Sequence, residues 1–140
     1  MSYTISDIVC KIMSTRDTLQ FYHWGTKSYA KHKASDELIE NLTKNLDRFV
    51  EAYLGANKDV KLKITKSFTL ESCNDNQLSS CLFELIDYLS DLSAESDVIR
   101  SFLRGSSSKQ KKQIINTDLL NIRDDIMGDI HKTLYLLTLG

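Results

Sequence analysis

The stretch FYHWGTKSYAKHKASDELIENLTKNLDRFVEAYLG, residues 21–55, decides the fold. After Ser28 its apolar residues recur three or four positions apart, which is the spacing of one helix face, until Gly55, a residue type common just after a helix. Gly25 and Thr26 interrupt the same spacing upstream. The stretch therefore predicts the end of one helix, a short turn, and a second helix over about residues 28–54 that packs antiparallel to the first.

Three further segments carry helical periodicity, over about residues 5–24, 76–103 and 117–138, with an interruption near residues 93–96. Ser6 or Asp7 is expected to cap the first of these helices, and Thr117 and Asp118 to open the last. Between the second and third helices, residues 60–68 alternate apolar and polar side chains, which predicts an extended segment or one short strand. The predicted fold class is all-α: a ferritin-like four-helix bundle in a single domain, residues 1–140, with a long extended connection between helices 2 and 3.

Composition limits the classes of function. The 140 residues are 41% hydrophobic and 26% charged with no Pro, which fits one mostly helical globular domain. A formal charge of -1 creates no overall field that attracts nucleic acid or an anionic membrane. Contact with nucleic acid would have to be local, for example at Lys109, Lys111 and Lys112 in a serine-rich loop. We therefore expect no membrane partner, and nucleic acid only through a local contact of this kind.

The three cysteines, Cys10, Cys73 and Cys81, are odd in number and far apart, so neither a disulfide framework nor a thiolate zinc site is indicated. This usage fits a reducing compartment. The first residues carry charges within their apolar pattern, and no apolar run approaches the ~20 residues of a membrane span. We expect a cytoplasmic protein, in the host cell if it is viral, or one that is made there and packaged in a virion.

Two imidazoles and two carboxylates in the quoted stretch form a candidate metal site: His23, His32, Asp47 and Glu51. This ligand chemistry suits iron or zinc. Asp47 and Glu51 lie four residues apart, so both point from the same helix face and are able to share one ion.

If all four residues serve one site, their spacing requires two chains. His23 ends one helix and His32 begins the next, so the turn brings their rings together, whereas His32 and Asp47 lie about 22 Å apart along one helix. A two-fold axis that packs two hairpins antiparallel would set the His pair of each chain against Asp47 and Glu51 of the other. The predicted minimal unit is therefore a homodimer, alone or within a higher homo-oligomer.

This pattern resembles the Dps branch of the ferritin superfamily, the DNA-binding proteins from starved cells. His23-Trp24 is similar to the family's His-Trp pair, His32 to its second His, and Asp47 and Glu51 follow at the family's spacing. The resemblance implies iron as the bound ion and a ferroxidase site across a dimer interface. The chain departs from the family in its shorter turn, in lacking a basic N-terminal tail, and in the extended residues 60–68, where Dps proteins carry a short helix.

The whole chain resembles a family of proteins found in bacteriophages and large DNA viruses, and the resemblance includes DLLNIRDDIMGDIHKTLYLLTLG at residues 118–140. Members of this family share the motif HW-x-T-x-S-Y-A-x-H, here residues 23–32. This resemblance implies a viral protein. It favours a second hypothesis, in which the chain is a structural, virion-associated helical bundle with no catalytic activity and other virion proteins as partners. Residues 60–68 would then pair with another chain.

The four candidate ligands also have interpretations without metal. His23 would be hydrogen-bonded to a carbonyl, with Trp24 and Tyr29 filling the end of the hairpin, and Asp47 would pair with Lys44 or Arg48.

A different metal site, within one chain, would join Asp47 and Glu51 to three residues of the last helix, namely Asp124, Asp125 and His131. The Glu-x-x-His pairs of ordinary ferritins are absent from the sequence.

Overall fold

The computed structural model describes residues 3–93, 96–104 and 118–139. Five helices lie in these ranges, α1 (Ile5–Gly25), α2 (Tyr29–Ala56), α3 (Asp75–Ser90), α4 (Asp97–Arg104) and α6 (Leu119–Leu136), with no β-strand among the described residues. None of these helices is long and apolar enough to cross a membrane. The predicted all-α class is confirmed, and the ferritin-like assignment stays a prediction.

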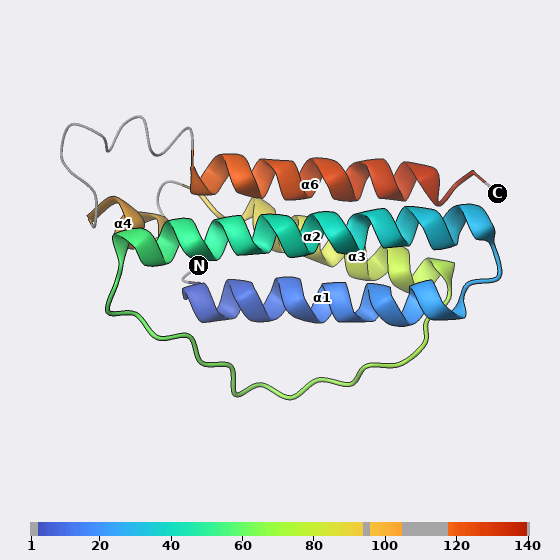
Figure 1. The fold of residues 1–140 in the computed structure, drawn as a ribbon, viewed down its shortest axis with the longest axis horizontal. Coiled ribbons are helices and arrows are strands. Elements are labelled where there is room, and N and C mark those ends of the chain that lie inside the picture. The colour runs from blue at the N-terminus through green and yellow to red at the C-terminus, as the bar shows by residue number, and fades with distance from the viewer. Residues whose placement is uncertain (1–2, 94–95, 105–117, 140) are drawn as a thin grey trace.

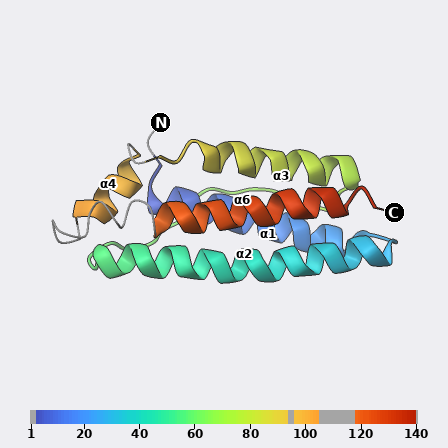
Figure 2. The same ribbon diagram turned by 90° about the horizontal axis from the view of Figure 1, so that it is seen from above.

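Four helices lie side by side, and α4 sits at one end (Figures 1 and 2). Helix α1 packs on α2 and α3, and α6 packs on the same two helices from the other side. The chain between α2 and α3, residues 57–74, is named the crossover here. It runs along the outside of α1 and returns to the end of the molecule where α1 meets α2 (Figure 1). The predicted long connection is therefore present, in extended form and without a strand.

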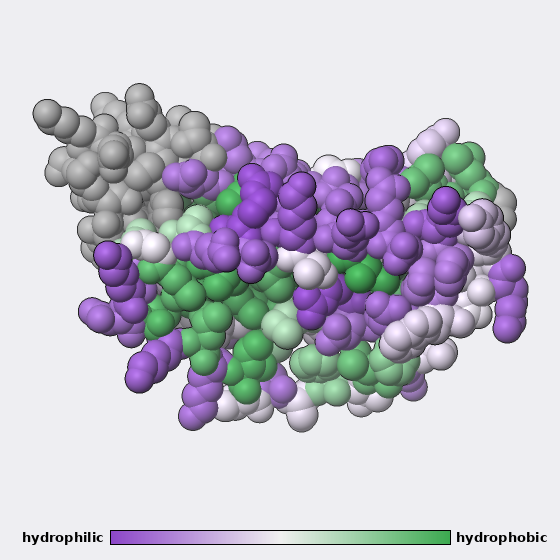
Figure 3. Space-filling model, viewed as in Figure 1, coloured by the Kyte–Doolittle hydropathy of each residue, from purple (hydrophilic) through white to green (hydrophobic). Residues whose placement is uncertain are grey.

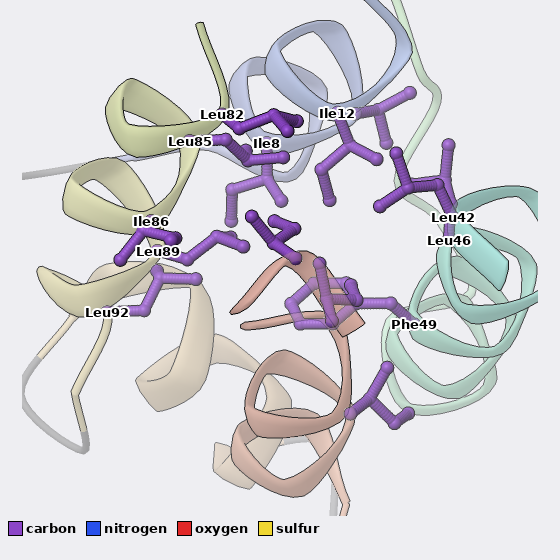
Figure 4. Close-up of a cluster of buried hydrophobic side chains, with 14 of the residues drawn as sticks. Ile8, Ile12, Leu42, Leu46, Phe49, Leu82, Leu85, Ile86, Leu89 and Leu92 are labelled. Atoms are coloured by element: carbon purple, nitrogen blue, oxygen red, sulfur yellow. The ribbon is translucent and has the colours of Figure 1, made fainter. Parts of the chain in front are cut away.

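All four long helices contribute to one apolar core, which explains why their apolar residues share one face. Figure 4 shows Ile8 and Ile12 of α1 directed toward Leu42 and Phe49 of α2 and toward the leucines of α3. The fully enclosed core side chains, each with under 2% of its surface exposed, include Tyr22, Phe49, Ile8, Ile12, Leu19, Leu38, Leu42, Leu78, Leu82, Leu85, Leu89 and Leu92. Burial at this density is the main term that stabilises a domain of this size.

The helix ends differ in detail from the sequence prediction. Thr4, and not Ser6 or Asp7, caps α1, because its side chain accepts from the Asp7 N–H while the Asp7 carboxylate accepts from the Thr4 N–H. Helix α2 continues through Gly55 to Ala56, since Asn57 caps the helix by donating from both its backbone and its side chain to the Tyr53 carbonyl.

The predicted third helix, residues 76–103, is divided into α3 and α4, which confirms the interruption expected near residues 93–96. The buried Ser96 side chain accepts a hydrogen bond from the Ser93 N–H at 3.0 Å, and this turn redirects the chain. Asp118 occupies the N-cap position of α6 without a side-chain capping bond, and Thr117 lies outside the described residues.

One polar cluster fixes the start of α3 against the α1–α2 hairpin. Asp75 accepts from the Tyr22 hydroxyl at 2.6 Å with one oxygen and from the Lys31 ammonium at 2.6 Å with the other. The hydrogen bond from Lys31, followed by that from Tyr22, lowers the pKa of the Asp75 carboxyl. Burial, followed by the bond to Asp75, raises the pKa of Tyr22 to about 12. The far end of the crossover is therefore tied to the hairpin.

Replacing Tyr22 by Phe should test this tie, because the change removes the hydroxyl and keeps the ring. We expect the free energy of unfolding to fall by about 1 kcal/mol, measured by urea denaturation at neutral pH. The pKa of Tyr22 is raised on folding. The contribution of the Tyr22 hydroxyl to the free energy of unfolding is therefore present below pH 10 and is lost as the pH rises toward 12. Between pH 10 and pH 12 the wild-type protein should lose this contribution, whereas Tyr22→Phe, which lacks the hydroxyl, has no such contribution to lose. Tyr135→Phe, at a 62% exposed tyrosine, is the control; equal stability of Tyr22→Phe and wild type at every pH would contradict the tie.

Candidate metal-binding site

The turn between α1 and α2 is only residues 26–28, and it brings His23 and His32 into contact. Ser28 caps α2 by accepting from the Lys31 N–H at 3.3 Å, so the second helix begins at once. The two imidazole rings stack with their centroids 3.8 Å apart and their planes 21° from parallel. The sequence prediction that the hairpin joins these two residues is therefore confirmed.

Reciprocal hydrogen bonds hold the pair. His23 Nδ1 lies 2.9 Å from the His32 carbonyl oxygen, and His32 Nδ1 lies 3.0 Å from the His23 carbonyl oxygen. A carbonyl only accepts, so each Nδ1 carries a hydrogen, and in the neutral ring Nε2 then keeps a lone pair. Neither Nε2 has a hydrogen-bond partner in the part of the chain that the structure describes. Metal-binding histidines almost always donate their other ring N–H to a carboxylate, a backbone carbonyl or water, and a bond from Nδ1 to a carbonyl is one such arrangement.

Ser35 supports the pair and was missed by sequence reasoning. It is fully buried, its hydroxyl donates toward the Lys31 and His32 carbonyls at 2.8 and 2.9 Å, and the same oxygen lies 3.1 Å from His23 Nδ1. The sequence does contain a signal for Ser35. It precedes Leu38 and Leu42 at the spacing of the inner face of α2, and a polar residue on that face needs a polar neighbour.

The two histidines differ in burial, and the aromatic residues beside them are exposed. His23 is buried and His32 is exposed, so the pair is open to solvent on the His32 side. Trp24 is 68% exposed and Tyr29 is 74% exposed. The interpretation that these aromatics fill the end of the hairpin is therefore wrong, although its expected hydrogen bond from His23 to a carbonyl is present.

The structure does not bring the carboxylates to the histidines within one chain. Asp47 and Glu51 lie on the same unbroken helix as His32, about 22 Å along its axis for Asp47. Both are exposed, and neither makes an ion pair with another described residue. Pairing of Asp47 with Arg48 is wrong, because Arg48 donates to Asn45 at 2.8 Å and to Asp125 at 3.4 Å. Lys44 does not pair with Asp47 either.

The single-chain alternative with the last helix does not form. Asp124 pairs with Arg123 at 2.7 Å, and Asp125 is held by Arg48. Across residues 3–93, 96–104 and 118–139, no group of three or more His, Cys, Asp or Glu side chains is close enough to hold a metal ion. The basic residues Lys109, Lys111 and Lys112 lie outside the described residues. One chain thus supplies a pair of imidazoles and, separately, a pair of carboxylates.

The fold and the paired imidazoles define an all-α protein with a stacked, reciprocally hydrogen-bonded histidine pair at the α1–α2 turn. The chain belongs to the family of unknown function DUF5856, whose model matches residues 23–137 and so begins at the first histidine of the pair. It is 27% identical over 128 residues to the uncharacterized 14.6 kDa protein in the mobD-ri intergenic region of Enterobacteria phage T4, covering 91% of this chain and 83% of that protein. No solved structure matches. The predicted likeness to a family found in phages is thus supported by a phage relative, and the Dps resemblance stays a prediction.

The hydrogen-bonded state of the two rings gives a direct prediction. In the metal-free protein, long-range ¹H–¹⁵N correlation spectra should show the hydrogen on Nδ1 of both His23 and His32 near neutral pH, because each Nδ1 donates to a carbonyl. His131, exposed on α6, serves as the internal reference. A ring that carries its hydrogen on Nε2 and none on Nδ1 would contradict the arrangement.

Proposed function

We propose that the protein binds iron between two copies of the chain, as a ferritin-like, Dps-like metal-binding protein. Fe(II) would be the substrate, held by His23 and His32 of one chain and Asp47 and Glu51 of the other, and oxidised there to Fe(III) by oxygen or peroxide. The observation that supports this most is the reciprocal hydrogen bonding, which leaves both Nε2 lone pairs free. In metal-binding histidines the second ring N–H is commonly held in this way, which orients the ring toward the ion.

The exposed surface of α2 is compatible with the required two-fold pairing. Suppose that two α2 helices pack antiparallel, with Glu40 of one helix opposite Asn41 of the other. Each residue then faces the partner residue whose number, added to its own, gives about 81. His32 then lies opposite the Glu51 end of the partner helix, and Glu37 lies opposite Lys44, all of them exposed.

Arg48 would meet Lys33 of the other chain in the same pairing. Asp125 already holds the Arg48 guanidinium at 3.4 Å, which offsets this like-charge contact. The exposed Trp24 and Tyr29 stand beside the imidazoles and provide apolar area for a partner to cover.

The geometry of the rings also bears on how many ions fit. Planes only 21° from parallel, with centroids 3.8 Å apart, keep the two lone pairs from converging on one point. Two neighbouring ions, each taking one imidazole and sharing a carboxylate, suit this geometry better than one ion held by both rings. Zinc has the same ligand preference, so the choice of iron rests on the Dps resemblance and needs a redox measurement.

A second candidate function is structural: a virion-associated bundle in which the same surfaces pack against other proteins without catalysis. The similarity to a phage protein and the exposed aromatic pair Trp24 and Tyr29 favour it. Under this function the protein would purify without metal, and its assembly would not respond to a chelator.

Removal of one carboxylate separates the two functions. Glu51→Ala should abolish the protein-dependent oxidation of Fe(II), followed as the growth of ferric absorbance after oxygen or peroxide is added, with the helical content unchanged, because Glu51 is exposed. Glu84→Ala, at an exposed glutamate on α3, is the matched control and should oxidise Fe(II) like wild type. Unchanged oxidation in Glu51→Ala, or none in wild type, would contradict the iron proposal.

Mixed oligomers test whether the ligands come from two chains. A His32→Ala chain and a Glu51→Ala chain should each be inactive alone. When they are unfolded together and refolded in equal amounts, a mixed dimer has one site lacking both ligands and one complete site, so about one quarter of the wild-type activity should return. A site built within one chain would give no recovery on mixing.

A further inference from the structure

The crossover holds an extended stretch whose backbone has few partners. Between residues 61 and 73, within the described part of the chain, the Lys63 N–H makes the one backbone hydrogen bond, donating to Ser6 Oγ of α1 at 3.1 Å. Every side chain from residue 61 to residue 69 is exposed. An extended chain with unpaired N–H and C=O groups is able to accept another strand along its edge.

The free edge can be identified. In an extended chain, neighbouring residues direct their backbone groups to opposite edges. Lys63 faces α1, as its bond to Ser6 shows, so Leu62 and Ile64 direct their N–H and C=O groups away from α1. The composition suits a strand, since Val60, Ile64, Thr65, Phe68 and Thr69 are β-branched or aromatic.

The crossover also carries an apolar surface with a basic rim. Leu62 and Ile64 are each 41% exposed, and Phe68 is 48% exposed. Figure 3 shows hydrophobic surface over the region where the crossover leaves α2 and passes α1, with hydrophilic side chains projecting at its margin. Val60, Lys61 and Lys63 line a cleft of about 450 Å³ together with the start of α1, Tyr53 of α2, and Asp97 and Val98 of α4.

The positive charge of the crossover indicates which kind of partner would bind there. Residues 58–70 contain Lys58, Lys61, Lys63 and Lys66 against the single acid Asp59. Only Lys66 of these lysines reaches an acid among the described residues, Asp7 at 3.8 Å. Two copies of the stretch would repel each other, whereas a segment that alternates acidic and apolar residues would match both the lysines and the apolar side chains.

We infer that residues 60–69 form a docking edge for an extended acidic segment of another protein, which adds as a β-strand on the edge that faces away from α1. Backbone hydrogen bonds to residues 62, 64 and 66 would fix the register, and the lysines would select the acidic side chains. This edge is separate from the histidine pair, so it does not depend on the proposed iron function.

The test uses the full chain and a fluorescently labelled peptide of alternating Glu and Val, with binding followed by fluorescence anisotropy. The Glu-Val peptide should bind, and a Lys-Val peptide should not. Lys61→Glu together with Lys63→Glu should weaken binding by about tenfold or more. His32→Ala should bind like wild type, since its imidazole lies outside the edge.

Two proline variants separate strand addition from simple charge attraction. Ile64→Pro removes an N–H on the free edge and should weaken binding roughly three- to tenfold, whereas Thr65→Pro removes one on the edge facing α1 and should bind like wild type. Both sites are outside helices, and circular dichroism checks that both variants fold. Equal binding by the two variants, undiminished binding of a Glu-Val peptide with every amide methylated, or self-association of the free chain through this stretch would overturn the inference.

Discussion

The reciprocal hydrogen bonds between His23 and His32 are the interaction on which the candidate site depends. They close a hairpin whose turn has only three residues, and they leave no freedom in which ring nitrogen carries the hydrogen. Ser35 adds a buried hydroxyl behind the pair, and the adjacent residues Tyr22 and Lys31 hold Asp75 at the start of α3. One short turn thus orients two imidazoles and also anchors the end of the crossover.

The α-helical fold was accessible from the sequence because burial imposes a period on each helix. The apolar spacing in residues 5–24 and 28–54 located α1 and α2 to within two residues, and the change to alternation after residue 59 identified the crossover. Helix ends were less predictable. Thr4 and Asn57 cap their helices through particular side-chain geometries, and Gly55 stays helical because a glycine permits a helix end without requiring one.

The site was only partly predictable, because the sequence pattern reports contacts between residues that are close in sequence and not those between distant residues or between chains. Contact between His23 and His32 follows from a short turn, which local spacing encodes, whereas the meeting of His32 with Asp47 and Glu51 depends on a second chain, about which periodicity says nothing. Asp75 was missed because its partners lie 53 and 44 residues away in sequence. The exposure of Trp24 and Tyr29 was missed because aromatic residues at a hairpin end are ordinarily buried.

A crystal structure of the full chain grown with Fe(II), with anomalous scattering recorded at the iron edge, tests the central claim most directly. The account predicts iron about 2 Å from Nε2 of His23 or His32 of one chain and about 2 Å from a carboxylate oxygen of Asp47 or Glu51 of another. Iron ligated by residues of a single chain, or a histidine pair free of iron in a crystal that binds iron elsewhere, would contradict it.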